Sequence, residues 1–281
     1  MAHKIVNLRD GSFRLDGGAM FGVVPRNLWE KCNPPDDQNR ILLGLNCLLV
    51  EGDGFLALID TGNGAKGDDD FRKIYGMENT GKLAEALRAH GRRPEEISHV
   101  INTHLHFDHC GGNTILEGGS VLPAFPQARY IVQKQEWLDA CKPSERSRAS
   151  YLADDFLPLK EAGQLDLVEG EGEVLPGIRL IPTPGHTRGH QSLLVEAEEG
   201  PVFYAADLFP TSSHLPLPWI MSYDLYPLET LETKRQILIR ARDEGWLFFF
   251  EHEADENALG KIEWVKTKKG EKPVFRPLPR V

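Results

Sequence analysis

The chain has 281 residues, of which 41% are hydrophobic, so it can bury one large core or two similar halves. Its 42 acidic and 32 basic residues give a formal charge of −10, which disfavours a nucleic-acid partner and favours a small or neutral substrate. The sequence has no export signal at its start and no uncharged apolar run of about 18 residues, so we expect a cytoplasmic protein that does not enter the membrane.

Apolar, β-rich runs of strand length alternate with segments of helical spacing along the whole chain. The predicted strands are residues 42–50, 55–59, 100–102, 130–132, 178–182, 192–195, 202–205 and 246–250. Helical spacing occurs in residues 82–91, 133–142 and 228–245, where Gly91 and Gly245 are typical of helix ends. This alternation predicts an α/β fold.

Four of the predicted strands end in a cluster of polar residues, after Ile101, Ile181, Ala205 and Phe250. Sites in α/β folds lie at the carboxyl ends of strands, so these clusters are the candidate site. Two long loops, residues 32–40 and 208–219, are rich in proline and polar residues. Such loops line a pocket, cover a subunit contact or are ordinary surface connections.

The segment THLHFDH, residues 103–109, places three imidazoles and a carboxylate within six residues directly after a predicted strand. A lone histidine is usually structural, but three at this spacing converge only where many nitrogen donors are needed, and a divalent metal is the usual reason. His104 and His106 can reach one ion, and Asp108 and His109 can turn toward a second.

Three further candidate ligands follow later strands: His186 in PTPGHTRGH, Asp207 in FYAADLFP and His252 in FFFEHE. With these residues the pattern resembles the metallo-β-lactamase fold superfamily, and the DTG turn at Asp60 extends the likeness toward the N-terminus. The resemblance implies a single domain of residues 1–281, a four-layer αββα sandwich with a dimetal site at one edge of its two sheets.

The same resemblance implies a role for each candidate ligand. It places His104, His106 and His186 on one metal, Asp108, His109 and His252 on the other, and Asp207 as a bridge between them. Asp60 would accept a hydrogen bond from a ligand histidine and hold it in place. Nitrogen and oxygen donors suit zinc, and they also accommodate iron, manganese or cobalt.

Two neighbouring metals can share a water, lower its pKa to about 7 and present it as hydroxide to carbon or phosphorus. Asp108 could then carry a proton. The sequence contains no G-x-S-x-G elbow of a serine hydrolase, no G-x-x-x-x-G-K phosphate loop, and no G-x-G-x-x-G after a strand. The pattern therefore predicts metal-assisted hydrolysis without a protein nucleophile.

Several branches of the superfamily differ from this chain at one ligand or in length. True β-lactamases carry cysteine or serine where Asp207 stands, and flavodiiron proteins carry glutamate in place of His106. About thirty residues follow His252, too few for the helical domain of glyoxalase II enzymes. The acidic charge disfavours the RNA-processing members.

The remaining likeness is to lactone and ester hydrolases, including N-acyl-homoserine lactonases and the methyl parathion hydrolase type. The expected function is thus a dinuclear hydrolase that uses a metal-bridging hydroxide on a small ester or lactone. An organophosphate triesterase, an iron-dependent sulfur oxygenase and a non-catalytic metal-bound scaffold are the alternatives.

One feature of the lactonases is missing, because they carry a tyrosine where this chain has Pro210. His214 and Tyr223 are the nearest polar candidates to assist the reaction. We expect a homodimer that forms through the N-terminal loop. Four aromatic side chains are expected to form apolar walls of the pocket: Phe21, Trp29, Phe209 and Trp219.

Overall fold

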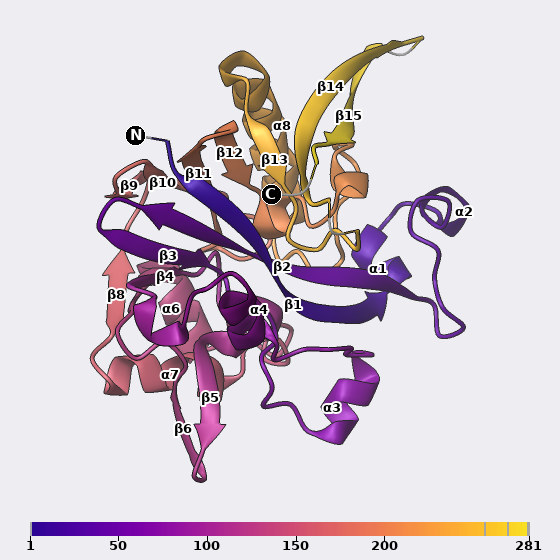
Figure 1. Ribbon diagram of the computed structural model, residues 1–281. Helices are drawn as coiled ribbons and strands as arrows, with labels where there is room; N and C mark the ends of the chain where they lie inside the picture. The colour runs from indigo at the N-terminus through magenta and orange to yellow at the C-terminus, as the bar shows by residue number, and fades with distance from the viewer. Residues whose placement is uncertain (1, 256, 269, 280–281) are drawn as a thin grey trace.

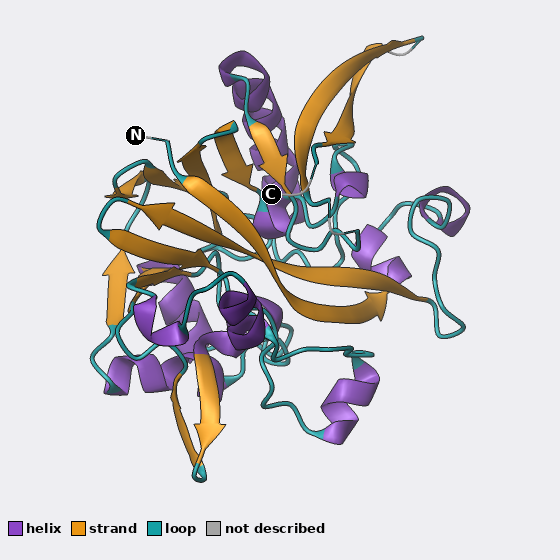
Figure 2. Ribbon diagram, in the orientation of Figure 1, coloured by secondary structure: helices purple, strands orange, loops and turns teal. Residues whose placement is uncertain are grey.

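Two β-sheets pack face to face in the computed structural model, which describes residues 2–255, 257–268 and 270–279. Helices cover the outer face of each sheet, which gives four layers in the order helix, sheet, sheet, helix (Figures 1 and 2). The predicted αββα sandwich is confirmed.

The first sheet has six strands in the order β1-β2-β3-β4-β7-β8, antiparallel from β1 to β3 and parallel from β3 to β8. Its strands are β1 (Lys4–Asp16), β2 (Arg40–Gly52), β3 (Phe55–Ile59), β4 (His99–Ile101), β7 (Arg129–Gln133) and β8 (Leu165–Val168). The helices that pack on its outer face are α4 (Leu83–Ala89), α6 (Lys134–Cys141) and α7 (Ala153–Glu161).

The second sheet has seven strands in the order β15-β14-β13-β12-β11-β10-β9. They are β9 (Gly172–Leu175), β10 (Ile178–Pro182), β11 (Gln191–Ala197), β12 (Gly200–Tyr204), β13 (Leu247–Phe249), β14 (Leu259–Thr267) and β15 (Gly270–Pro277). Its one parallel pair, β12 and β13, is joined through α8 (Pro227–Glu244), which covers the outer face. Gly245 ends this helix in the left-handed conformation, with φ 71°, as its position predicted.

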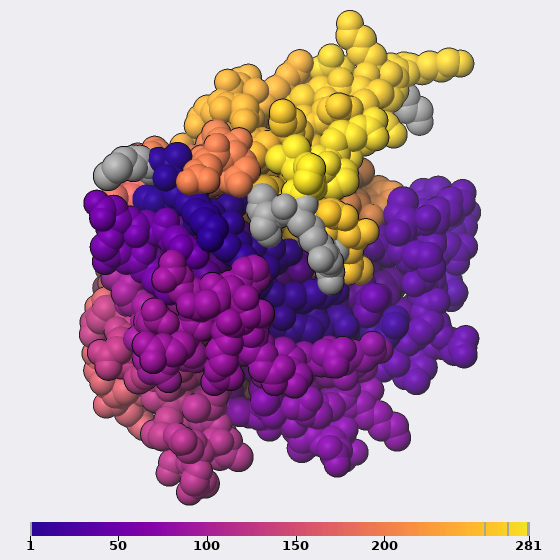
Figure 3. Space-filling model, in the orientation of Figure 1, coloured from indigo at the N-terminus to yellow at the C-terminus, as the bar shows by residue number. Residues whose placement is uncertain are grey.

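Shorter elements complete the structure. The short helices are α1 (Gly17–Phe21), α2 (Arg26–Trp29), α3 (Asp69–Ile74) and α5 (Phe107–Cys110), with 3-10 turns at Pro94–Glu96, Gly111–Asn113, Ala206–Leu208 and Ser212–His214. Strands β5 (Thr114–Glu117) and β6 (Ser120–Pro123) form a separate hairpin. This hairpin and the hairpin β14–β15 project from opposite ends of the molecule (Figures 1 and 3).

The central strands of the second sheet are buried on both faces. On β12, Val202 and Tyr204 lie in the core between the sheets, whereas Phe203 lies in the core beneath α8. Strands covered on both sides form continuous apolar runs, and such runs can be recognised in the sequence. All eight predicted strands are confirmed. No helix in the described part of the chain is long and apolar enough to cross a membrane.

Candidate metal centre

The polar clusters predicted at four strand ends meet at one edge of the two sheets. The segment containing His104 and His109 follows β4, and His186 lies in the turn between β10 and β11. Asp207 follows β12, and His252 follows β13. The structure thus brings together all seven predicted ligands, which lie up to 148 residues apart in the sequence and are all buried.

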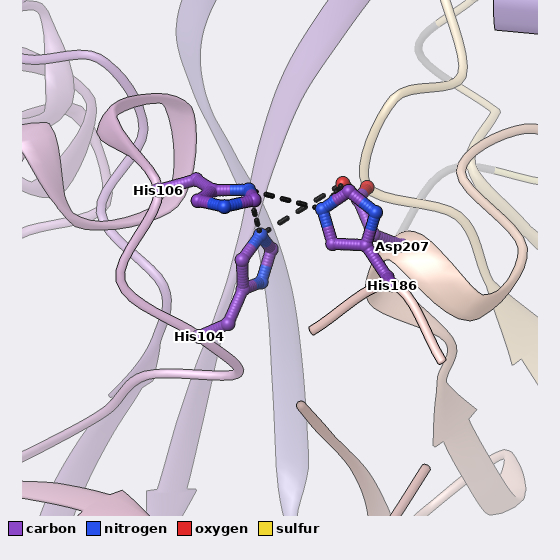
Figure 4. A group of neighbouring side chains, drawn as sticks. All are labelled: His104, His106, His186 and Asp207. Atoms are coloured by element: carbon purple, nitrogen blue, oxygen red, sulfur yellow. Dashed lines mark hydrogen bonds and ion pairs between the residues drawn. The ribbon is translucent and has the colours of Figure 1, made fainter. Parts of the chain in front are cut away.

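The first ligand set consists of His104, His106, His186 and Asp207, whose side chains point toward one another (Figure 4). The Nδ1 atom of His106 lies 3.1 Å from His104 Nε2 and 3.0 Å from His186 Nε2. Asp207 Oδ2 lies 3.0 Å from His186 Nε2 and 3.8 Å from His104 Nε2. Four donor atoms therefore surround one small space.

The second ligand set consists of Asp108, His109 and His252, together with the other oxygen of Asp207. The Nε2 atoms of His109 and His252 lie 3.2 Å apart, and Asp207 Oδ1 lies 3.5 and 3.2 Å from them. Asp108 Oδ2 lies 3.8 and 3.7 Å from the same two nitrogens. The two oxygens of Asp207 therefore face different sets, as a bridging carboxylate requires.

Hydrogen bonding alone does not account for these contacts. A neutral imidazole has one N–H, so the ring nitrogens that meet in the first set cannot all be satisfied by one another. The Oδ1 atom of Asp207 is buried and has no hydrogen-bond partner among the described residues. Donor atoms around a tetrahedral zinc ion lie about 3.4 Å apart, within the spread of the separations above. The residues present fit two divalent cations.

Hydrogen bonds on the far side of two rings direct their Nε2 atoms at the ligand sets. His186 Nδ1 lies 2.9 Å from Asp224 Oδ1, and His252 Nδ1 lies 2.9 Å from the Gly44 carbonyl. Both partners are acceptors, so Nδ1 carries the proton and the Nε2 lone pair remains free. Such outer contacts are typical of metal-ligating histidines.

His109 has two carboxylates on its far side. Its Nδ1 atom lies 3.1 Å from Asp60 Oδ2 and 2.8 Å from Glu251 Oε2. Asp60 also accepts hydrogen bonds from the backbone N–H and hydroxyl of Thr103, at 2.8 and 2.7 Å. Asp60 therefore occupies the place that the sequence predicted for it, and Glu251 is an additional partner that no motif indicated. Burial raises the pKa of Glu251 to about 8.

The backbone that carries Asp207 is held in an unusual conformation. The preceding residue, Ala206, has a φ of 46°, in the left-handed region that favours glycine. The N–H of Asp207 donates to His190 Nε2 over 3.2 Å, and His190 Nδ1 lies 2.8 Å from the Thr183 hydroxyl. His190 therefore hydrogen-bonds within the fold and supports the backbone that carries the Asp207 carboxylate. Strained backbone of this kind concentrates at functional sites.

A cavity of about 280 Å³ opens above both ligand sets. Its volume is near the lower limit for small-molecule sites, which favours a small substrate. The ligands that reach it are His106, Asp108, His186, Asp207 and His252. Its apolar wall is Leu15, Met20, Phe107, Met221 and Leu225, and its other lining residues are Tyr75, Arg146, Ser147, Ser150, Ser222 and Tyr223.

Of the two predicted assisting residues, Tyr223 lines this cavity and His214 does not. His214 is buried, with Nδ1 2.8 Å from the Thr211 hydroxyl and Nε2 2.9 Å from the Met20 carbonyl. Its ring also stacks on Phe21, with centroids 4.7 Å apart. Because both nitrogens are engaged in the protein interior, His214 supports the fold beside the cavity and is not available to a substrate there.

The four aromatics predicted as pocket walls pack behind the wall instead. Phe21 stacks on Trp29 with centroids 5.3 Å apart and meets Trp219 edge to face at 5.6 Å. Phe209 lies in the core beneath α8. The residues that replace them in the cavity include Tyr75 and Arg146, which no sequence motif marks and which only the fold brings to this place.

Comparison with known proteins agrees with this geometry. Residues 41–252 match the family model of the Metallo-beta-lactamase superfamily, and the chain belongs to that superfamily. An N-acyl homoserine lactonase from Bacillus sp. is 30% identical over 229 residues, which cover 77% of this chain and 84% of the relative. The family match and relatives of this kind identify the chain as a metallo-hydrolase.

Solved structures show the same likeness over nearly the whole chain. A probable metal-dependent hydrolase from Staphylococcus aureus has a TM-score of 0.88 and 27% identity, covering 99% of this chain and 98% of its own. An N-acyl homoserine lactone hydrolase with the product N-hexanoyl-L-homoserine bound at its catalytic metal centre has a TM-score of 0.70 and 26% identity. That match covers 90% of this chain and 94% of the other.

Proposed function

We propose that this chain hydrolyses a small lactone or ester at two metal ions held by the first and second ligand sets. The observation that carries the proposal is the position of Asp207, which directs one carboxylate oxygen into each set at the base of a single cavity. The lactonase relatives support a lactone as the substrate class. Zinc is the proposed element, and iron, manganese and cobalt are alternatives for the same donors.

The ions, when bound, supply an activated water and polarise the substrate oxygen. The chain's own residues orient the substrate and handle protons. Asp108 lines the cavity beside the second set, where its carboxylate can carry a proton to the leaving oxygen. The apolar wall at Leu15, Met20 and Phe107 accommodates the acyl part of a substrate.

Tyr223 is the proposed hydrogen-bond donor to the substrate in place of the tyrosine that lactonases carry at the position of Pro210. Burial raises the pKa of Tyr223, so its phenol stays protonated and can donate at neutral pH. Pro210 instead supports a ligand through its backbone, because its carbonyl accepts a hydrogen bond from the N–H of His252 over 3.0 Å.

Arg146 is the one arginine or lysine that lines the cavity among the described residues. It is exposed, donates to the Ser222 carbonyl and forms no ion pair with another residue in the described ranges. Its remaining N–H groups can donate to a substrate carbonyl, or to the carboxylate that ester or lactone hydrolysis releases.

The alternatives make different predictions about metal content. An iron-dependent sulfur oxygenase needs one metal, whereas two complete ligand sets favour two. A non-catalytic scaffold would not need metal ligands that line a cavity. Phosphotriester hydrolysis uses the same activated water, so we retain it as a second activity to be measured.

The experiment combines metal analysis of the purified protein with hydrolysis of γ-lactones with and without acyl chains, aryl esters, a phosphotriester and a β-lactam. We expect about two zinc ions per chain and lactone or ester turnover that a chelator abolishes and zinc restores. One iron per chain would favour the oxygenase, and two metals without any hydrolysis would favour the scaffold.

We further propose that the chain forms a homodimer through its N-terminal loop. Val23 and Leu28, in the segment around α1 and α2, are 90% and 47% exposed, so this segment offers apolar surface to a second copy of the chain. Light scattering tests this proposal, and a monomeric mass would contradict it.

A further inference from the structure

Glu136 is a buried carboxylate that the proposed reaction does not use. It lies in the first turn of α6, directly after β7, and its side chain has no solvent exposure. Burial of a carboxylate is costly unless its oxygens are hydrogen-bonded. Its partners therefore indicate what this carboxylate does.

The hydrogen bonds of Glu136 join two segments that carry metal ligands. Oε1 accepts from the backbone N–H of Leu105 over 3.0 Å and from the Tyr151 hydroxyl over 2.9 Å. Oε2 accepts from the Thr187 hydroxyl over 2.6 Å. Leu105 lies between His104 and His106 in the sequence, and Thr187 directly follows His186.

Two further contacts connect Glu136 and its partners to the first ligand set. The ring of Tyr151 meets the ring of His106 edge to face, with centroids 4.7 Å apart. The loop after His186 approaches α6 so closely that a Cβ on Gly189 would lie 2.2 Å from the Glu136 nitrogen. A larger residue at position 189 would therefore push this loop away from Glu136.

Leu105 and Thr187 are sequence neighbours of ligands of the first set, and Tyr151 contacts one of them through its ring. None of these three residues is next to a ligand of the second set in the sequence. The second set is supported separately, since His109 is hydrogen-bonded to Asp60 and lies 2.8 Å from Glu251, and His252 is hydrogen-bonded to the Gly44 carbonyl. The two sets share Asp207 but depend on different outer partners.

We propose that Glu136 is a positioning residue that holds His104, His106 and His186 in metal-binding geometry. Metal affinity of the first set depends on it, and affinity of the second set does not. The inference rests on the metal ligation in the proposed function. It does not depend on which substrate the protein hydrolyses.

The test measures zinc affinity, with no substrate present. Metal-free protein is titrated with zinc against a chromophoric chelator, for wild type and for Glu136→Met, which keeps the side-chain length but removes both acceptors. Loss of an outer partner typically weakens metal binding about 10- to 100-fold. We expect that loss at one of two zinc sites and less than about a threefold change at the other.

Asp155→Asn is the matched control. Asp155 is a buried carboxylate on α7 that pairs with Lys66 at 3.0 Å, so its loss disturbs the interior without touching the bonds of Glu136. Both zinc affinities should stay near wild type in this variant. Equal weakening of both sites in Glu136→Met, or no weakening, would overturn the inference.

Milder variants cover the case in which Glu136→Met does not fold. Thr187→Val and Tyr151→Phe each remove one donor, and circular dichroism of the metal-free proteins reports whether they fold. Each folded variant should weaken one zinc site about threefold or more, and folded variants with unchanged affinities would overturn the inference. A wild-type protein that binds two zinc ions but hydrolyses nothing would contradict the proposed function alone.

Discussion

His186 and Asp224 are joined by a 2.9 Å hydrogen bond on the side of the imidazole that faces away from the first ligand set. Asp224 is buried in the segment that precedes α8, 38 residues after His186. The carboxylate keeps the ring proton on Nδ1, so the lone pair of Nε2 stays directed toward Asp207. A residue outside both ligand sets thus decides how one ligand is oriented.

Replacing Asp224 should therefore weaken metal binding without removing a ligand. In Asp224→Ala, His186 loses its acceptor and can rotate or change tautomer, and we expect zinc affinity to fall about 10- to 100-fold. Equilibrium competition with a chelator measures this change. Asp166→Ala is the control, because its carboxylate pairs with Arg129 away from the site. Unchanged zinc affinity in Asp224→Ala would contradict the assigned role.

Asp108→Asn tests the proton transfer. The amide can still offer an oxygen to the second ligand set, but it cannot accept and release a proton at neutral pH. General acid–base catalysis contributes about 100- to 10,000-fold, so kcat for lactone hydrolysis should fall by at least about 100-fold. Metal analysis accompanies the kinetics. Two retained metals with little loss of kcat would remove Asp108 from the proton path.

Arg146→Met tests whether the guanidinium at the cavity binds substrate. Loss of one exposed hydrogen bond costs about 1 kcal/mol, so we expect KM to rise about fivefold with kcat nearly unchanged. Arg148→Met is a matched control, since Arg148 is a neighbouring exposed arginine that does not line the cavity. Equal KM values in the two variants would mean that Arg146 does not contact the substrate.

Asp10 should make stability depend on pH. It is buried and accepts hydrogen bonds from the N–H groups of Gly64 and Leu83, each over 3.0 Å. Burial raises its pKa from 3.8 to about 6. Between these values the folded state keeps a proton that the unfolded state releases. The free energy of unfolding should therefore fall by about 3 kcal/mol as pH rises from about 4 to about 6.

Urea unfolding of the metal-free protein across this range measures the dependence. Asp10→Asn cannot titrate, so the difference in unfolding free energy between it and the wild type should change with pH in this window. Asp53→Asn, at an exposed position, should keep the wild-type slope. Parallel curves for the wild type and Asp10→Asn would show that the pKa of Asp10 is near its ordinary value.

Three strands that the sequence did not predict share a physical property. In strands β1, β14 and β15 charged or polar residues interrupt the apolar ones, and only β14 alternates half-buried residues with exposed charged ones. Their apolar residues are interrupted too often to form a recognisable run in the sequence. The single-domain organisation of residues 1–281 and the cytoplasmic location stay predictions.

The sequence by itself determined the α/β class and the ligand candidates, because buried strands are apolar runs and clustered histidines at their ends have few other uses. The four layers were implied by the resemblance to the metallo-β-lactamase superfamily. Only the tertiary structure decided which side chains surround those ligands. Glu136 and Asp224 reach the site from segments with no motif, Glu251 stands next to His252 without a role that its motif indicated, and His214 turns into the core. Such contacts depend on how loops far apart in the chain pack together, and no local pattern of residues encodes that packing.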